Sequence, residues 1–204
     1  YRVRDHGDIV YLGPTGLSGW ELTPAPAAWR EDFGHLATSQ EAAAFGNFGL
    51  PARAAIEFEI SWKKKPDFVF AIGVGPDPKS AKKAFRFEVW ADDLVINRDL
   101  DQKVDLQGVQ AIEAGPGRAH LQVFIEQETG LCIVFSGTGK KLAEIQIPPQ
   151  KPEVLGGVRL ENIRGDIRLE RLRITRWTGA LPREVEADQP RVHLNDGTIE
   201  YGKL

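Results

Sequence analysis

The 204-residue sequence contains no methionine and a single cysteine, Cys132. One cysteine excludes an intramolecular disulfide, and a cysteine-based zinc site is not expected. Because Cys132 stands in the apolar segment 131–135, we expect it to be a small buried side chain and not a reactive thiol. A chain that begins at Tyr1 and lacks methionine is not expected to be an intact translation product.

The chain also lacks an excess of either charge and has no long apolar run. Lys and Arg total 26 and Asp and Glu total 29, which gives a formal net charge of -3. With no overall basic field, nucleic acid is not expected as a partner. The apolar runs are too short to span a bilayer, so membrane insertion is not expected either.

The clearest pattern present is alternation of apolar and other residues with a period of two. Residues 56–62 read Ile-Glu-Phe-Glu-Ile-Ser-Trp, and residues 85–90 read Phe-Arg-Phe-Glu-Val-Trp. Such alternation places one set of side chains on a core face and the other set on a second face of a strand. Many such strands without a convincing long helix predict an all-β, two-sheet antiparallel sandwich.

Nine strands are predicted in the central part of the chain, at residues 52–62, 68–74, 84–90, 94–97, 119–126, 131–136, 142–147, 157–162 and 166–177. An earlier short strand is predicted at residues 9–12. Segment 68–72 is apolar on both faces and should lie in the interior of a sheet. The apolar pairs of the last strand change phase, so a β-bulge is expected near Glu170 and Arg171. Segment 40–45 is the best short helix candidate, although it could equally precede a strand.

The domain boundaries follow from proline content and turn signals. We expect residues 1–178 to form the sandwich and residues 179–190, with two prolines, to form a linker. Residues 191–204 predict a β-hairpin around Asn195, Asp196 and Gly197. An isolated hairpin is marginally stable, so it either packs on the sandwich or begins a small β-barrel that the chain cuts short.

The strand series from residue 56 to residue 174, with the opening Leu-Ser-Gly-Trp at residues 17–20, resembles the concanavalin A-like lectin/glucanase superfamily. Within it, the chain is similar to laminin-G-like domains and to the bacterial 3-keto-disaccharide hydrolase-like domain. The resemblance implies a jelly-roll sandwich in a larger extracytoplasmic bacterial protein, with neighbouring domains as partners. Residues 192–204 resemble the first hairpin of small Sm-like or SH3-like barrels.

Three carboxylates are candidates for catalysis. Glu57 and Glu59 share a strand face, about 7 Å apart by strand rise, and Glu88 lies on another strand. Paired carboxylates at such spacings can hydrolyse glycosides. The laminarinase-type members of the superfamily carry Glu-x-Asp-x-x-Glu on one strand, a motif that this sequence lacks. The alternative is a solvated outer face without catalysis.

A carbohydrate site needs an aromatic ring for the apolar face of the sugar and polar groups for its hydroxyls. Residues of these kinds lie on the second faces of two predicted strands. The ligand-binding candidates are Trp90, Arg86, Glu88, Gln122 and Phe124. The alternative is that Trp90 and Phe124 pack under loops.

Calcium is the one metal that the sequence suggests, and no other cofactor is expected. Asp99, Asp101 and Asp105 lie close together in loop-rich sequence, and calcium requires several oxygen ligands. They could equally be ordinary turn aspartates. The basic segments 63–65 and 79–83 are expected to be solvated turn charges, with binding of a polyanionic glycan as the alternative.

We therefore expect a non-catalytic carbohydrate-recognition or structural module with a glycan as a possible partner. The first alternative is a glycoside-hydrolase-like enzyme, in which two carboxylates meet across a deep cleft. The second is an architectural spacer that presents neighbouring domains and has no ligand pocket.

Overall fold

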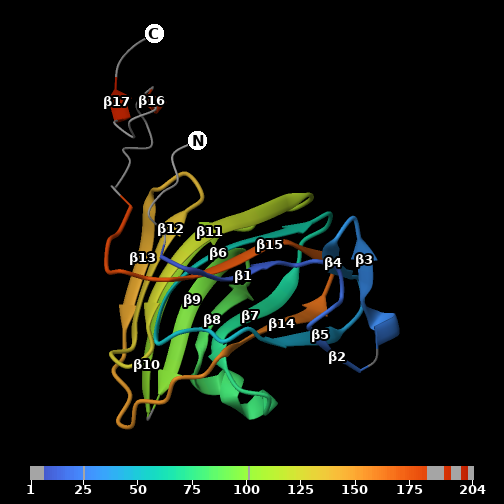
Figure 1. Ribbon diagram of the computed structural model, residues 1–204. Helices are drawn as coiled ribbons and strands as arrows, with labels where there is room; N and C mark the ends of the chain where they lie inside the picture. Colours follow the sequence, from blue (N-terminus) through green and yellow to red (C-terminus); the bar gives the residue numbers. More distant parts are fainter. Residues whose placement is uncertain (1–6, 25, 101, 183–190, 194–198, 202–204) are drawn as a thin grey trace.

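The computed structural model describes residues 7–24, 26–100, 102–182, 191–193 and 199–201. Two large antiparallel sheets lie face to face (Figure 1), and the buried apolar side chains of the core lie between them. This arrangement confirms the predicted all-β sandwich. In the described residues, no helix is long and apolar enough to cross a membrane.

One sheet, called the β6 sheet after its long central strand, has the strand order β13-β12-β11-β6-β15-β4-β3. Strand β4 pairs with residues 167–169 of β15, and β1 pairs with residues 172–175 of the same strand. The β6 sheet consists of β1 (Ile9–Gly13), β3 (Arg30–Asp32), β4 (His35–Thr38), β6 (Arg53–Trp62), β11 (Gly117–Glu126), β12 (Leu131–Ser136), β13 (Lys141–Gln146) and β15 (Ile167–Arg176).

The other sheet, called the β8 sheet, has the strand order β10-β9-β8-β7-β14-β5-β2. Two short 3-10 helices, η1 (Pro26–Ala28) and η2 (Pro78–Lys83), connect its strands to their neighbours. The β8 sheet consists of β2 (Glu21–Thr23), β5 (Ala42–Asn47), β7 (Asp67–Val74), β8 (Phe85–Trp90), β9 (Asp93–Leu100), β10 (Lys103–Ala111) and β14 (Gly157–Arg164).

The register of β6 shows how the alternating sequence builds the core. Phe58 pairs with Leu121 of β11 and Leu172 of β15, and all three side chains are fully buried. The predicted bulge is confirmed, because the register of β15 shifts between Leu169 and Arg171. The extra residue returns the apolar positions after it to the core face.

The short strands β2, β3 and β4 were not among the predicted strands, and two further elements also differ from the sequence prediction. The helix candidate at residues 40–45 is wrong, since β5 is a strand that pairs with β14 and β2. Its alanines fit a buried strand because Ala44 packs in the core with no exposure. Strand β10 was not predicted, because Lys103–Ala111 is an edge strand with mostly exposed side chains.

The C-terminal hairpin is present as two short strands, β16 (Arg191–His193) and β17 (Ile199–Tyr201). They pair antiparallel, with Arg191 opposite Tyr201. The predicted turn at residues 195–197 and residues 183–190 of the linker predicted at 179–190 lie outside the described residues.

Candidate functional site

The outer face of the β8 sheet, directed away from the other sheet, carries a partly exposed tryptophan. The side chain of Trp90 is 48% exposed, at the end of β8 where the chain turns through Ala91 with φ 52°. The turn follows from the sequence, since Ala91-Asp92-Asp93 reverses the chain between two apolar strands. Trp90 therefore stands at the rim of a sheet with its indole accessible to a ligand.

A chain of hydrogen bonds holds the Trp90 indole in place. The Trp90 Nε1–H donates to Glu88 Oε2 at 2.8 Å, and Arg86 Nε lies 3.0 Å from Glu88 Oε1. Arg86 also donates twice to Asn97 Oδ1, at 3.0 and 2.8 Å. Asn97 is buried on β9, opposite Arg86 in the ladder. Asn97 thus orients Arg86, Arg86 orients Glu88, and Glu88 orients the Trp90 indole.

A second arginine–glutamate pair lies on the same face across β7. Arg159 Nη2 and Glu161 Oε1, both on β14, are 3.5 Å apart. The ladder places Ala71 of β7 between Arg159 and Arg86, while Val69 lies between the two glutamates. Short side chains therefore separate two polar pairs.

We call this set of six residues the Trp90 face: Arg86, Glu88, Trp90, Asn97, Arg159 and Glu161. The face combines an accessible ring with fixed donors and acceptors, which is the combination that a sugar requires. Sequence reasoning missed Asn97, Arg159 and Glu161. Arg159 and Glu161 alternate with apolar residues in β14, whereas Asn97 follows three apolar residues in β9. The strand pairing that brings the three residues together was not visible in the sequence.

Two of the predicted ligand-binding residues lie elsewhere. Gln122 and Phe124 belong to β11 and face outward from the β6 sheet, where Gln122 pairs with Glu57. Phe124 is 3% exposed and packs against Phe135 and Trp177. The predicted grouping of five residues into one site is therefore wrong. Trp90, Arg86 and Glu88 lie together, while the other two lie on the opposite side of the sandwich.

The catalytic candidates are divided in the same way. Glu57 and Glu59 share the outer face of the β6 sheet, and Glu88 lies on the β8 sheet. Glu57 Oε1 lies 2.8 Å from His120 Nε2 and accepts a hydrogen bond from Arg171 Nη1 at 2.8 Å. Glu59 Oε1 accepts from Arg118 Nη1 at 3.2 Å. These two carboxylates are held in cross-strand pairs.

A third carboxylate on the β6 sheet also has several partners. Glu170, the bulge residue of β15, accepts hydrogen bonds from Ser61 and from Arg168. Arg168 also pairs with Asp32 of β3 at 3.2 Å. Burial raises the pKa of Glu170, but the bonds from Ser61 and Arg168 outweigh it and leave the pKa below its usual value. Cross-strand bonds of this kind stabilise the sheet.

The pairing of Glu57 predicts acid sensitivity. Burial raises the pKa of Glu57, but the hydrogen bonds from His120 and Arg171 outweigh it and hold the pKa below its usual value of 4.5. A carboxyl whose pKa is lowered by folding stabilises the protein at pH values above its pKa in the unfolded state. This contribution is lost as the pH falls through its pKa in the folded state. We expect Glu57→Gln to lower the free energy of unfolding at pH 7 by about 1 kcal/mol.

Urea unfolding at pH 7 and at several values below 4.5 tests this expectation. Relative to wild type, Glu57→Gln should lose less stability on acidification, because it has no carboxylate to protonate. The exposed Glu113→Gln is the matched control and should follow wild type. If Glu57→Gln lost as much stability on acidification as wild type does, that result would contradict the stabilising role of the Glu57 contacts with His120 and Arg171.

The calcium candidates remain a prediction. Asp101 lies outside the described residues. Asp99 pairs with Val104 across the β9–β10 hairpin, and Asp105 accepts a hydrogen bond from the Gln146 backbone N–H at 3.1 Å, which links β10 to β13. Among the residues that the structure describes, no group of three or more His, Cys, Asp and Glu side chains is arranged to hold a metal.

Comparison of the fold with solved structures shows similar β-sandwiches. Bacillus licheniformis β-glucanase matches with a TM-score of 0.57 and 9% identity, over 84% of this chain and 99% of that one. A putative glycosyl hydrolase from Parabacteroides distasonis matches with a TM-score of 0.53 and 11% identity, over 78% and 99%. The fold is a two-sheet antiparallel jelly-roll sandwich.

A protein described as a sialidase matches with a TM-score of 0.59 and 10% identity, over 79% of this chain. The chain spans 17% of the length of that sialidase. No family model matches the sequence, and no curated protein matches it. At these identities the likeness shows the fold, which confirms the jelly roll predicted from the strand series.

Proposed function

We propose that this chain is a non-catalytic carbohydrate-recognition module of a larger extracytoplasmic bacterial protein, and that the Trp90 face is its binding surface. The observation that carries the proposal is the exposed Trp90 indole, held by Glu88 through a 2.8 Å hydrogen bond. A ring fixed before binding loses little conformational entropy when a sugar stacks on it.

The polar members of the Trp90 face supply the second requirement of sugar binding. Glu88 and Glu161 offer carboxylate oxygens, and Arg86 and Arg159 offer N–H groups on either side of the short Ala71 and Val69. Such groups can fix the hydroxyls of a sugar whose apolar face lies on the ring. The solved structures with this fold include proteins named as a β-glucanase and glycosyl hydrolases, which supports a carbohydrate ligand.

A glycan array, run with calcium and again with a chelator, tests the proposal. We expect wild type to bind one class of glycan and Trp90→Ala to bind it at least tenfold more weakly, since a loss of about 1.4 kcal/mol in binding free energy is tenfold in affinity. Phe33→Ala is the matched control, because Phe33 is an exposed aromatic at the β3–β4 turn of the other sheet.

Each outcome of the array has a defined meaning. Loss of binding in Trp90→Ala with retention in Phe33→Ala would support the Trp90 face. Loss on chelation would add a calcium site to it. No binding under any condition would overturn carbohydrate recognition and favour an architectural spacer.

A glycosidase-like enzyme is the second candidate. The observation that favours it is the pair Glu57 and Glu59 on one open face, within a fold shared with glycosyl hydrolases. Against it, a general acid needs a raised pKa, whereas the pKa of Glu57 is lowered. Release of reducing sugar from an array-positive glycan by wild type, lost in Glu57→Gln, would favour the enzyme over the binding module.

A further inference from the structure

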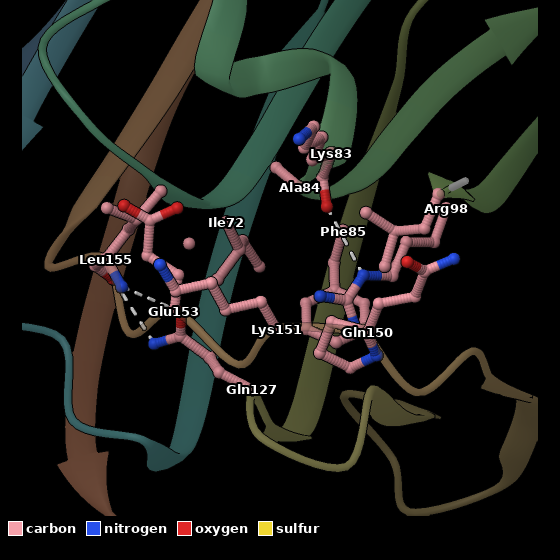
Figure 2. Close-up of a pocket in the computed structure, with 13 residues that line it drawn as sticks. Ile72, Lys83, Ala84, Phe85, Arg98, Gln127, Gln150, Lys151, Glu153 and Leu155 are labelled. Atoms are coloured by element: carbon pink, nitrogen blue, oxygen red, sulfur yellow. Dashed lines mark hydrogen bonds between the residues drawn. The ribbon is translucent and has the colours of Figure 1, made fainter.

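A pocket at one end of the sandwich lies apart from the Trp90 face. Its walls come from β7, β9, the end of η2 and the connection between β13 and β14, and its volume is about 200 Å³. Figure 2 shows Arg98, Lys151 and Gln150 among the side chains around it, with Phe85 beside Arg98. Since one liquid water occupies about 30 Å³, the pocket can hold a group several times that size.

The base of the pocket contains a buried arginine. Arg98 is 6% exposed, and its Nε donates to the Lys83 carbonyl at 3.2 Å (Figure 2). Its Nη1 donates to the Ile147 carbonyl at 3.2 Å. The guanidinium also lies over the Phe85 ring, with Cζ 4.2 Å from the ring centroid. These contacts fix the orientation of the planar group before any ligand arrives.

Nothing in the described part of the chain balances the charge of Arg98. Among the described residues, no carboxylate oxygen lies within 4.0 Å of its guanidinium, and no hydrogen-bond acceptor is found for its Nη2. The nearby Cys132 does not compensate, since burial raises the pKa of its thiol and leaves it neutral. Burial lowers the pKa of Arg98 to about 10, which still leaves it charged at neutral pH.

A buried charge without a partner is costly, so a group that neutralises it gains a large interaction energy. The rim of the pocket has the same sign. Lys83 and Lys151 are exposed lysines that line it, and Glu153 is the one acidic residue among the lining residues that the structure describes. Lys83 belongs to the basic segment 79–83. The sequence allows two interpretations of its lysines: solvated turn charges, or a site for a polyanionic glycan.

We propose that this pocket binds an oxyanion, the carboxylate or sulfate group of a small acidic ligand. The Nη2 group of a guanidinium carries N–H donors that form charge-assisted hydrogen bonds with the oxygens of a carboxylate or sulfate. Arg98 forms the fixed base, with Nη2 as the available donor, and Lys83 and Lys151 attract the anion from solution. The site is separate from the Trp90 face and does not depend on the function proposed for that face.

Calorimetric titration with sodium sulfate, sodium glucuronate and glucose 6-sulfate tests the proposal, with ionic strength held constant by sodium chloride. We expect all three anions to bind to wild type and glucose to show no binding. The response to glucuronate and to the sulfate ester separates a carboxylate from a sulfate as the preferred group. Anion binding that merely follows ionic strength, with chloride as effective as sulfate, would overturn the proposal.

Three variants locate the site. Lys151→Glu should weaken anion binding at least fivefold, because it reverses one charge at the rim. Lys64→Glu, an exposed lysine on the turn that precedes β7, is the matched control and should bind as wild type does. Trp90→Ala should also bind anions normally, so failure of the carbohydrate proposal and failure of this one remain distinguishable.

A direct readout of Arg98 avoids reliance on a core substitution that could unfold the chain. In ¹⁵N NMR, the Arg98 Nε–Hε resonance should shift on addition of glucuronate. The glucuronate concentration at half-saturation should equal the one that calorimetry gives. Arg98→Lys, checked for folding by circular dichroism, should bind the anion more weakly because an ammonium lacks the planar fork. Equal affinity of wild type, Lys151→Glu and folded Arg98→Lys would place the anion elsewhere and contradict the assignment.

Discussion

Phe58→Ala is expected to lower the free energy of unfolding by about 3–5 kcal/mol. Phe58 is fully buried between the two sheets, with its ring centroid 4.6 Å from that of Phe70 and 5.2 Å from that of Phe87. Truncation removes the burial of one ring and leaves a cavity that strands fixed on both sides cannot fill. Urea unfolding at pH 7 measures the loss.

The same truncation on the surface supplies the control. Phe33 is 95% exposed, so Phe33→Ala should change the free energy of unfolding by less than about 0.5 kcal/mol. A Phe58→Ala protein as stable as Phe33→Ala would contradict the packing of β6 against β7 and β8. Because Phe58 of β6 packs against the facing sheet at this point, that result would call the arrangement of the sandwich into question.

Gln127→Ala is expected to destabilise the protein by about 3 kcal/mol. The buried Gln127 side chain donates to the carbonyls of Pro51 and Leu155, each at 3.2 Å, and accepts from the Leu155 backbone N–H at 3.0 Å. It therefore ties the loop before β6 to the connection between β13 and β14. Truncation leaves these backbone groups without their partner, which is more costly than removing an exposed bond.

Hydrogen exchange distinguishes this role from general loss of packing. In Gln127→Ala, the Leu155 amide should exchange faster than core amides such as those of Phe58 and Leu121, because its local bond is gone. Gln146→Ala, an exposed glutamine on β13, is the control and should match wild type. If hydrogen exchange became equally faster at all amides, with Leu155 no different from the core, that result would contradict a local role for the Gln127 hydrogen bonds.

The strands of the core could be predicted from the sequence because each carries its own evidence. The alternation of residues 56–62 needs no information from elsewhere in the chain, and β6 spans Arg53–Trp62. The phase change in the last strand likewise located the bulge at Glu170. Where the local pattern was weak, tertiary context decided the structure. The alanines of β5 form a strand because β14 and β2 pair with them.

The candidate site could be predicted in part. Arg86, Glu88 and Trp90 share one strand, so alternation alone placed them on one face, and the structure joins them by hydrogen bonds. Alternation does not show to which sheet a strand belongs. For that reason Gln122 and Phe124 were grouped with Trp90, although β11 lies in the opposite sheet. Asn97 required knowledge of the β8–β9 pairing.

The burial of Arg98 in the pocket could not be predicted from the sequence either. Arg98 follows the last residue of the strand predicted at 94–97, so it lies outside the predicted strands. Strand β9 continues to Leu100, which directs Arg98 toward the interior and against Phe85. Whether a carboxylate pairs with Arg98 depends on the three-dimensional arrangement of neighbours that are distant in sequence, and no described carboxylate does so.

An NMR titration of wild type with the glycan that gives the strongest array signal, with the Trp90 indole Nε1–H as the probe, tests the Trp90 face directly. We expect this resonance to shift and saturate together with the amides of Val95 and Asn97 on β9. Shifts confined to His120 and Gln122 on the opposite sheet, with the Trp90 indole unchanged, would contradict the Trp90 face as the carbohydrate-binding surface.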